Sequence, residues 1–136
     1  MDFLKRRSDE VYAVTRIVVG FLFMCHGLDK LDFLLTGGSF AGNAAGYAQM
    51  PLPLGWAIAT IETLTGAAVM LGFWAGGAAF LASGTIAVAY FMAHQKAGLL
   101  PIQNQGELAA LFSWAFLLIA SRGSGRLSLD AARGVR

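Results

Sequence analysis

The chain has 136 residues, enough for one domain. Apolar residues make up 57% of it and charged residues only 13%, about half the charged fraction of an ordinary soluble domain. This shortage of charge indicates a protein whose partner is the lipid bilayer. The formal net charge is only +2, and the 10 basic residues form no continuous patch, so we expect no nucleic-acid partner.

Four apolar segments of helical length follow one another along the chain. We expect membrane-spanning helices over residues 11–31, 54–73, 76–94 and 107–121, because a bilayer core requires about 20 apolar residues. The segments are too long for strands and lack their alternating pattern. The predicted fold is all-α: one integral membrane domain over residues 1–136, built as an antiparallel transmembrane four-helix bundle. A soluble helical bundle is disfavoured because no segment has a charged outer face.

Basic residues lie at the two ends of the chain. Lys5, Arg6 and Arg7 precede the first segment, and four arginines follow the last, whereas the connections 32–53 and 95–106 hold only Lys96. The positive-inside rule therefore places both termini in the cytoplasm. The apolar run after the N-terminal basic residues is longer than that of a signal peptide, so we interpret it as a retained span.

The two outer connections differ in what they predict. Residues 32–53 contain a short interfacial helix in our interpretation, which begins at the N-cap Ser39 and ends near residue 49. Residues 95–106 are polar at both ends. They either help to cover the outer mouth of the bundle or form a plain solvated connector.

Polar residues gather on one side of the first span. At 100° per residue, Arg16, His26 and Lys30 fall within a sector of about 120°, together with Gly20 and Gly27. The glycines allow a neighbouring helix to approach closely. The only cysteine, Cys25, falls on the opposite side, which favours inert packing over a catalytic thiol and excludes an intrachain disulfide.

The ionisable residues also share a depth near the outer end of the spans. Glu62 lies about 12 Å below the start of its helix. A charge at that depth is costly unless it is paired, so we predict an ion pair with Lys30 or His26. The third span should line the same interior with Tyr90 and His94. The fourth should add Glu107, Leu111 and Trp114, and the preceding connection Asn104.

Arg16 lies closer to the inner end and forms a separate anchor. It can reach lipid phosphates, take part in a second ion pair or bind an anionic partner. No acidic residue of the other spans lies at its depth. This favours lipid, backbone carbonyls or a partner protein.

The ordered set of these residues resembles the DoxX family of small four-span membrane proteins. The residues that carry the resemblance extend over nearly the whole chain: Arg16, Gly20, His26, Gly27, Lys30 and Leu31, then Glu62, Gly66 and Gly72, then His94, Asn104, Gly106 and Glu107, and the tail GSGRLSLD over 123–130. The family takes its name from a subunit of an archaeal terminal quinol oxidase. Relatives act in thiosulfate:quinone oxidoreduction, and others in membrane complexes with sulfurtransferase and superoxide dismutase partners. The resemblance implies a quinone-linked component in a prokaryotic inner membrane.

Two functions follow as expectations. In the first, a quinone binds in the outer half of the bundle, with His26, Lys30 and Glu62 as catalytic candidates and a binding set of Tyr90, His94, Asn104, Glu107 and Trp114. A histidine would donate to a quinone oxygen, a glutamate would pass protons, and Lys30 would stabilise a reduced anion or a small anionic sulfur compound. In the second, the chain is a non-catalytic accessory subunit of a larger membrane complex. A channel is disfavoured because four short spans leave little interior room.

No motif in the sequence binds a metal or an organic cofactor. There is no iron–sulfur cysteine set and no flavin motif, and His26 and His94 are weak candidates for a haem pair. Electrons for the first function would therefore come from a partner or directly from the substrate.

Overall fold

The computed structural model describes residues 2–135 and contains helices but no strand in that range, as predicted. The bounds are α1 Asp2–Arg6, α2 Ser8–Thr36, α3 Ala44–Tyr47, α4 Leu52–Leu71, α5 Ala75–Ala89, the π-helical turn η1 Tyr90–His94, the 3-10 turn η2 Gln95–Ala97, α6 Glu107–Arg122 and α7 Leu129–Ala132.

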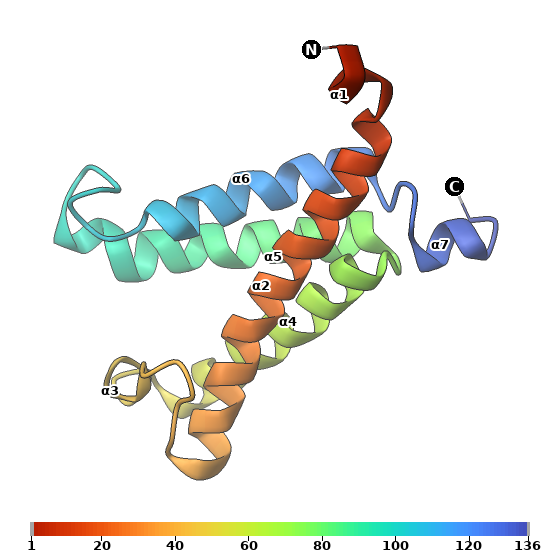
Figure 1. Cartoon of the computed structure of the whole chain (residues 1–136). Coiled ribbons are helices and arrows are strands. Elements are labelled where there is room, and N and C mark those ends of the chain that lie inside the picture. Colours follow the sequence, from red (N-terminus) through yellow and green to blue (C-terminus); the bar gives the residue numbers. More distant parts are fainter. Residues whose placement is uncertain (1, 136) are drawn as a thin grey trace.

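The long helices form two antiparallel hairpins (Figure 1). α2 packs along α4, and α5 packs along α6. The hairpins lie close together where α4 turns into α5, and they diverge toward their other ends. We call the first the terminal end, because both chain termini lie there, and the second the loop end. Instead of four nearly parallel axes, as in the expected bundle, the structure has two helix pairs that cross at an angle.

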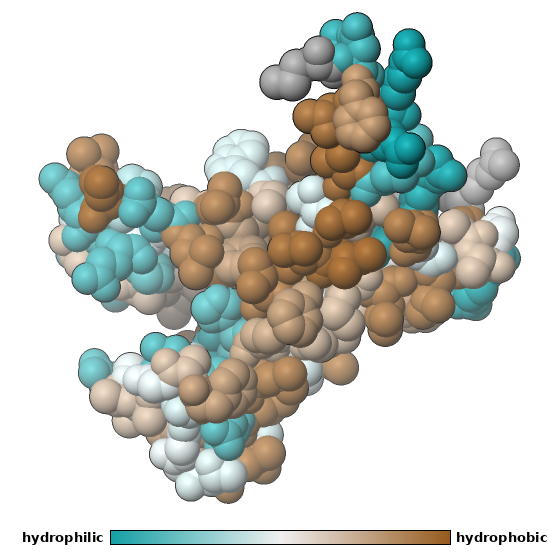
Figure 2. Space-filling model, in the orientation of Figure 1, coloured by the Kyte–Doolittle hydropathy of each residue, from teal (hydrophilic) through white to brown (hydrophobic). Residues whose placement is uncertain are grey.

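Three helical stretches are long and apolar enough to cross a membrane: α2, α4, and α5 with its continuation through η2. In Figure 2 apolar side chains cover the middle of the molecule, and polar ones gather at its extremities. The chain is therefore a membrane protein. α6 has 16 residues, or about 24 Å of helix, which is shorter than a bilayer core of about 30 Å. Its length does not confirm the fourth predicted span.

Backbone-specific residues end the helices. Gly37 closes α2 with a φ of 77° and Gly72 closes α4 with a φ of 68°, a left-handed conformation that a side chain disfavours. Pro51 and Pro53 open α4, where their missing N–H groups cost no intrahelical bond. Only Gly72, Phe73 and Trp74 separate α4 from α5, so a tight turn joins the two helices.

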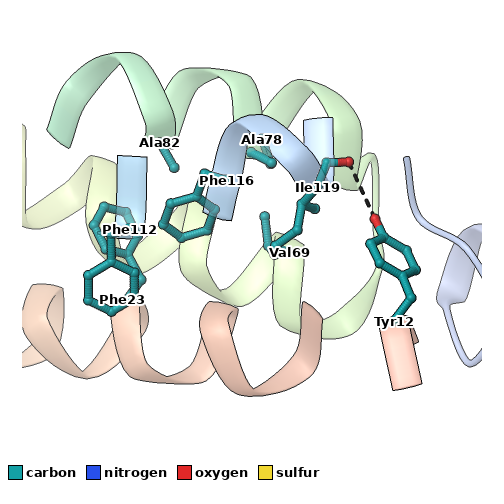
Figure 3. Packing of buried hydrophobic residues seen from close by; sticks show 9 residues of the cluster. Tyr12, Phe23, Val69, Ala78, Ala82, Phe112, Phe116 and Ile119 are labelled. Atoms are coloured by element: carbon teal, nitrogen blue, oxygen red, sulfur yellow. Dashed lines mark hydrogen bonds between the residues drawn. The ribbon is translucent and has the colours of Figure 1, made fainter. Parts of the chain in front are cut away.

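The hydrophobic core lies where the two hairpins cross (Figure 3). Phe23 of α2 packs against Phe112 and Phe116 of α6, with ring centroids 5.6 and 4.7 Å away. Small side chains of α5, among them Ala78 and Ala82, complete the cluster. Because alanines occupy little space, the aromatic rings of α2 and α6 can bridge the hairpins at this point.

Two glycines bring α2 and α4 into backbone contact. A Cβ atom on Gly66 would lie 2.5 Å from the backbone nitrogen of Met24, and one on Gly20 would lie 2.5 Å from that of Met70. Neither distance is sterically allowed, so the close approach requires glycine at both positions. This confirms the predicted inward face of the first span.

We therefore expect Gly66→Ala to lower the free energy of unfolding by about 1–3 kcal/mol, because the helices must move apart. Gly84→Ala is the matched control, since a Cβ atom there meets no atom within 4 Å. Alanine should leave stability unchanged or raise it slightly. Unfolding of the purified protein in mild detergent measures both. Equal stability of the two variants would contradict the close helix contact.

Candidate functional site

A cleft opens between the two hairpins toward the loop end. Its cavity is about 310 Å3, and the hollow between the two hairpins is visible in Figure 2. Both hairpins line it with apolar side chains, among them Phe23, Ile58 and Ile86. The polar side chains in its lining are His26, Lys30, Glu62, His94 and Gln105. The cleft thus brings together four of the residues predicted from the sequence.

The predicted ion pair is formed inside this cleft. Lys30 Nζ lies 2.7 Å from Glu62 Oε2, and the two side chains are only 14% and 4% exposed. Gly27 lets the helices meet beside the pair, because a Cβ atom there would lie 2.5 Å from the backbone nitrogen of Thr63. Either charge alone would be costly at this depth, so each residue stabilises the charged form of the other.

The two histidines line the cleft from opposite hairpins. His26 of α2 packs edge-on against Phe112, with ring centroids 5.9 Å apart. His94 lies in the π-helical turn, a distortion that often occurs at functional sites, and its Nδ1 is 3.1 Å from the backbone oxygen of Asn104. Among residues 2–135, no group of three or more histidine, cysteine or acidic side chains is placed to hold a metal ion.

Asn104 and Tyr90 support His94 rather than line the cleft. The Asn104 amide is buried and donates to the Tyr90 hydroxyl oxygen at 3.2 Å and to the carbonyl of Gly98 at 2.9 Å. The Tyr90 ring stacks on His94 with centroids 6.1 Å apart. The connection before α6 is therefore ordered by hydrogen bonds within its own hairpin.

The predicted inner face of the fourth span is wrong. Glu107 is exposed, and Trp114 is 71% exposed. α6 instead buries a different stripe, consisting of Ala109, Phe112, Phe116 and Ile119. A helix that is apolar on all sides gives no periodic signal for its buried face. Here the phenylalanines that reach α2 determine it.

Asp29 is a buried acidic residue whose partners lie outside the predicted polar cluster. It is 1% exposed, and its carboxylate accepts hydrogen bonds from four groups of the loop that follows α2. The donors are the Ser39 hydroxyl at 2.8 Å, the Ala41 N–H at 3.0 Å, the Asn43 amide at 3.2 Å and the Tyr47 hydroxyl at 2.8 Å. In the sequence, the signal for this network is that several hydroxyl and amide side chains follow Asp29 by 10 to 18 residues, while Asp29 itself has no predicted partner.

This network corrects the predicted interfacial helix. The Ser39 hydroxyl donates to Asp29 and its oxygen accepts the N–H of Asn43, whereas α3 is limited to Ala44–Tyr47 with Asn43 as its N-cap. Burial, and then the contact with Asp29, raises the pKa of Tyr47 above its ordinary value. The Tyr47 ring also faces Lys30, whose Nζ lies 5.3 Å from the ring centroid. The loop thereby covers one side of the ion pair.

Arg16 ties the terminal end together. It is fully buried, and its guanidinium donates to four backbone carbonyls at the end of α4 and in the C-terminal segment, those of Val69, Met70, Arg126 and Leu127. Backbone carbonyls were one of the predicted alternatives. Contact with lipid phosphate is excluded by the burial.

A second contact holds the same segment. The Asp130 carboxylate accepts a hydrogen bond from the backbone N–H of Trp74 at 2.8 Å, and the Asp130 N–H donates to the Gly72 carbonyl at 3.1 Å. Trp74 has a φ of 47°, which is unfavourable for a residue with a side chain. The tail therefore stabilises the turn that joins the two hairpins.

We expect Arg16→Met to lower the free energy of unfolding by about 2–4 kcal/mol, because four backbone carbonyls lose their charged donor. The C-terminal segment should also become sensitive to proteases. Arg6→Met removes an exposed arginine at the same end and serves as the control. A tail that stays resistant in the Arg16 variant would contradict this anchoring role.

We expect Asp29→Asn to release the loop over residues 37–50. An amide replaces one acceptor oxygen with a donor, so amide exchange at Ala41 should accelerate about tenfold or more. The pKa of Tyr47 should fall toward its ordinary value in an absorbance titration, because the contribution of Asp29 is lost. Asp32→Asn is the control, since among the described residues the Asp32 side chain bonds only Thr36 of the same helix. Unchanged amide exchange at Ala41 in both variants would contradict the role of Asp29 in holding this loop.

Comparisons with known proteins identify the family of the chain. The model of the DoxX family matches residues 11–95, which include the ion pair, both histidines and Arg16. A protein of Haemophilus influenzae, described as an uncharacterized protein, is 37% identical over 134 residues and is covered to 96%, as is this chain. No solved structure matches the chain significantly. The chain belongs to the DoxX family.

Proposed function

We propose that this protein is the membrane component of a quinone-linked oxidoreductase system and that the cleft binds the quinone head group. The observation that carries the proposal is the buried Lys30–Glu62 pair in an otherwise apolar cleft. An aromatic head group with two oxygens needs flat apolar walls and a few polar groups that fix its orientation. A protein surface that only contacts lipid needs no such polar groups.

The residues of the cleft suit this ligand in charge and in hydrogen bonding. The pair has no net charge, so a neutral head group can enter without an electrostatic penalty. Lys30 has three ammonium protons, and among residues 2–135 only Glu62 accepts one of them. The remaining protons can bind a ligand oxygen and stabilise negative charge as it develops there.

The proton and electron parts of the reaction have different sources in this proposal. Glu62 lies next to the bound oxygen and can exchange a proton, and the histidines offer further proton-carrying groups. The quinone supplies the electron-accepting chemistry when it is bound. A partner protein or a small sulfur compound delivers the electrons, because the chain has no cofactor-binding motif.

We place the protein in a prokaryotic cell membrane with both termini in the cytoplasm and α6 as a fourth, short span. Three observations support this placement: the basic residues concentrate at the terminal end, α6 packs antiparallel to α5, and the exposed side of α6 is apolar, with Leu108, Leu111 and Leu118. The cleft then opens near the outer surface of the membrane.

An accessory subunit is the second candidate function. In its favour, Lys30 and Glu62 come from different helices, so the pair also joins α2 to α4. In this case the ion pair would fix helix register, and the apolar surface would dock on a larger membrane complex. The two functions predict different effects when the ion pair is removed. Loss of the pair should weaken quinone binding in the first case and release a membrane complex in the second.

We expect Glu62→Gln to weaken binding of a short-chain quinone about tenfold or more, because it removes the counter-charge that holds the Lys30 ammonium in place. Quinone reduction with thiosulfate as donor should decrease with it. Titration calorimetry of the protein in mild detergent measures the affinity. Glu10→Gln is the control, since Glu10 also forms an ion pair, with Arg126, but at the exposed terminal end.

Wild-type quinone affinity in the Glu62 variant, together with loss of a co-purifying membrane complex, would refute the binding proposal and support the accessory function. Equal loss of affinity in both variants would indicate a general effect of charge rather than a site.

A further inference from the structure

We infer that His94 presents an unprotonated Nε2 to the cleft and accepts a hydrogen bond from a hydroxyl of the bound head group, with Asn104 as the positioning residue. The identity of the ligand rests on the proposed function. The tautomer of the neutral ring follows from the geometry alone. It reverses the expectation that His94 donates to a quinone oxygen.

The chemistry of the Asn104 contact determines which nitrogen carries the proton. His94 Nδ1 lies 3.1 Å from a backbone carbonyl oxygen, and a carbonyl oxygen can only accept. The proton of the neutral ring must therefore be on Nδ1. A neutral imidazole has one N–H, so Nε2 keeps its lone pair. Nε2 has no partner among residues 2–135, and His94 lines the cleft.

The loop end holds that carbonyl in place through the Asn104 side chain. The amide donates to Tyr90 and Gly98, and its oxygen accepts the N–H of Gly106 at 2.8 Å. Gly106 is required here, because a Cβ atom would lie 2.5 Å from Cε2 of the Tyr90 ring and 2.6 Å from the Asn104 oxygen. A buried side chain thus fixes the backbone on both sides of the carbonyl that binds His94.

The two hairpins then offer opposite hydrogen-bonding groups. Lys30 on one hairpin can only donate, and neutral His94 on the other can only accept at its free nitrogen. A head group that carries an acceptor oxygen and a hydroxyl can satisfy both. A head group whose oxygens are all carbonyls or ethers leaves the lone pair of His94 without a donor. The cleft should therefore favour hydroxyl-bearing head groups.

The test combines nitrogen NMR with two redox-inert probes, 2,3,5-trimethylphenol and its methyl ether. Spectra of 15N-histidine-labelled full-length protein are recorded at about pH 8.5, roughly two units above the ordinary histidine pKa. His94→Gln assigns the signals, because the chain has only two histidines. We expect protonated Nδ1 and unprotonated Nε2 for His94. The phenol should bind about five- to tenfold more tightly than the ether and shift the Nε2 signal.

Variants of the loop test the positioning role. Asn104→Ala should give a mixture of His94 tautomers and remove most of the preference for the phenol. Tyr90→Phe deletes only one bond to the Asn104 amide. It should therefore reduce both the tautomer preference and the preference for the phenol in part, without unfolding the loop. Gln103→Ala, an exposed neighbour, is the control that should change neither readout.

The outcomes separate this inference from the proposed function. A proton on Nε2, or equal affinity for phenol and ether, would overturn the acceptor role of His94 while the cleft remains a binding site. Failure of both probes and of short-chain quinones to bind would overturn the proposed function and, with it, this role. A wild-type tautomer and preference in the Asn104 and Tyr90 variants would refute the positioning role.

Discussion

The polar groups of α2 lie in a helix that is apolar almost everywhere else, and a bilayer offers no water to satisfy them. Each must therefore find its partner within the protein. Arg16 binds the end of α4 and the C-terminal segment, Lys30 binds Glu62 in the lining of the cleft, and Asp29 binds the loop that follows α2. Three polar side chains at different levels thus attach three separate segments to one helix.

Within the described part of the chain, polar contacts join the two hairpins at the terminal end of the molecule but not at the loop end. At the terminal end, Arg16 and Asp130 join α2, the α4–α5 turn and the tail by hydrogen bonds to backbone atoms. At the loop end, Asp29 organises one loop and Asn104 the other, but each network stays on its own hairpin. No hydrogen bond or ion pair among residues 2–135 joins the two loops. The hairpins can therefore diverge there, and the cleft is a consequence of where the polar contacts are placed.

The sequence can predict a contact when the residue concerned has only one or a few possible partners. The Glu62–Lys30 pair was predictable because a carboxylate at that depth has few partners, and the helical spacing of the first span placed Lys30 on the right face. The loop partners of Asp29 were not, because loop geometry has no period that brings Ser39 or Tyr47 back to a given residue. The face of α6 was misjudged because Trp114 and Phe112 are both large and apolar, and only contact with Phe23 distinguishes them. The crossing of the hairpins depends on such contacts and has no local signature.

The ion pair also bears on the choice between the two functions. A buried pair of opposite charges is expensive to desolvate, and an apolar pair of similar size often holds two helices together equally well. Gly20 and Gly66 already bring α2 and α4 into backbone contact without it. A purely structural role would therefore need neither charge. The pair faces a cavity, its ammonium has unused protons, and a histidine lies on the opposite wall. If the charges bind a ligand oxygen, this binding explains why the desolvation cost of the pair is tolerated. If the charges only join two helices, that cost has no explanation.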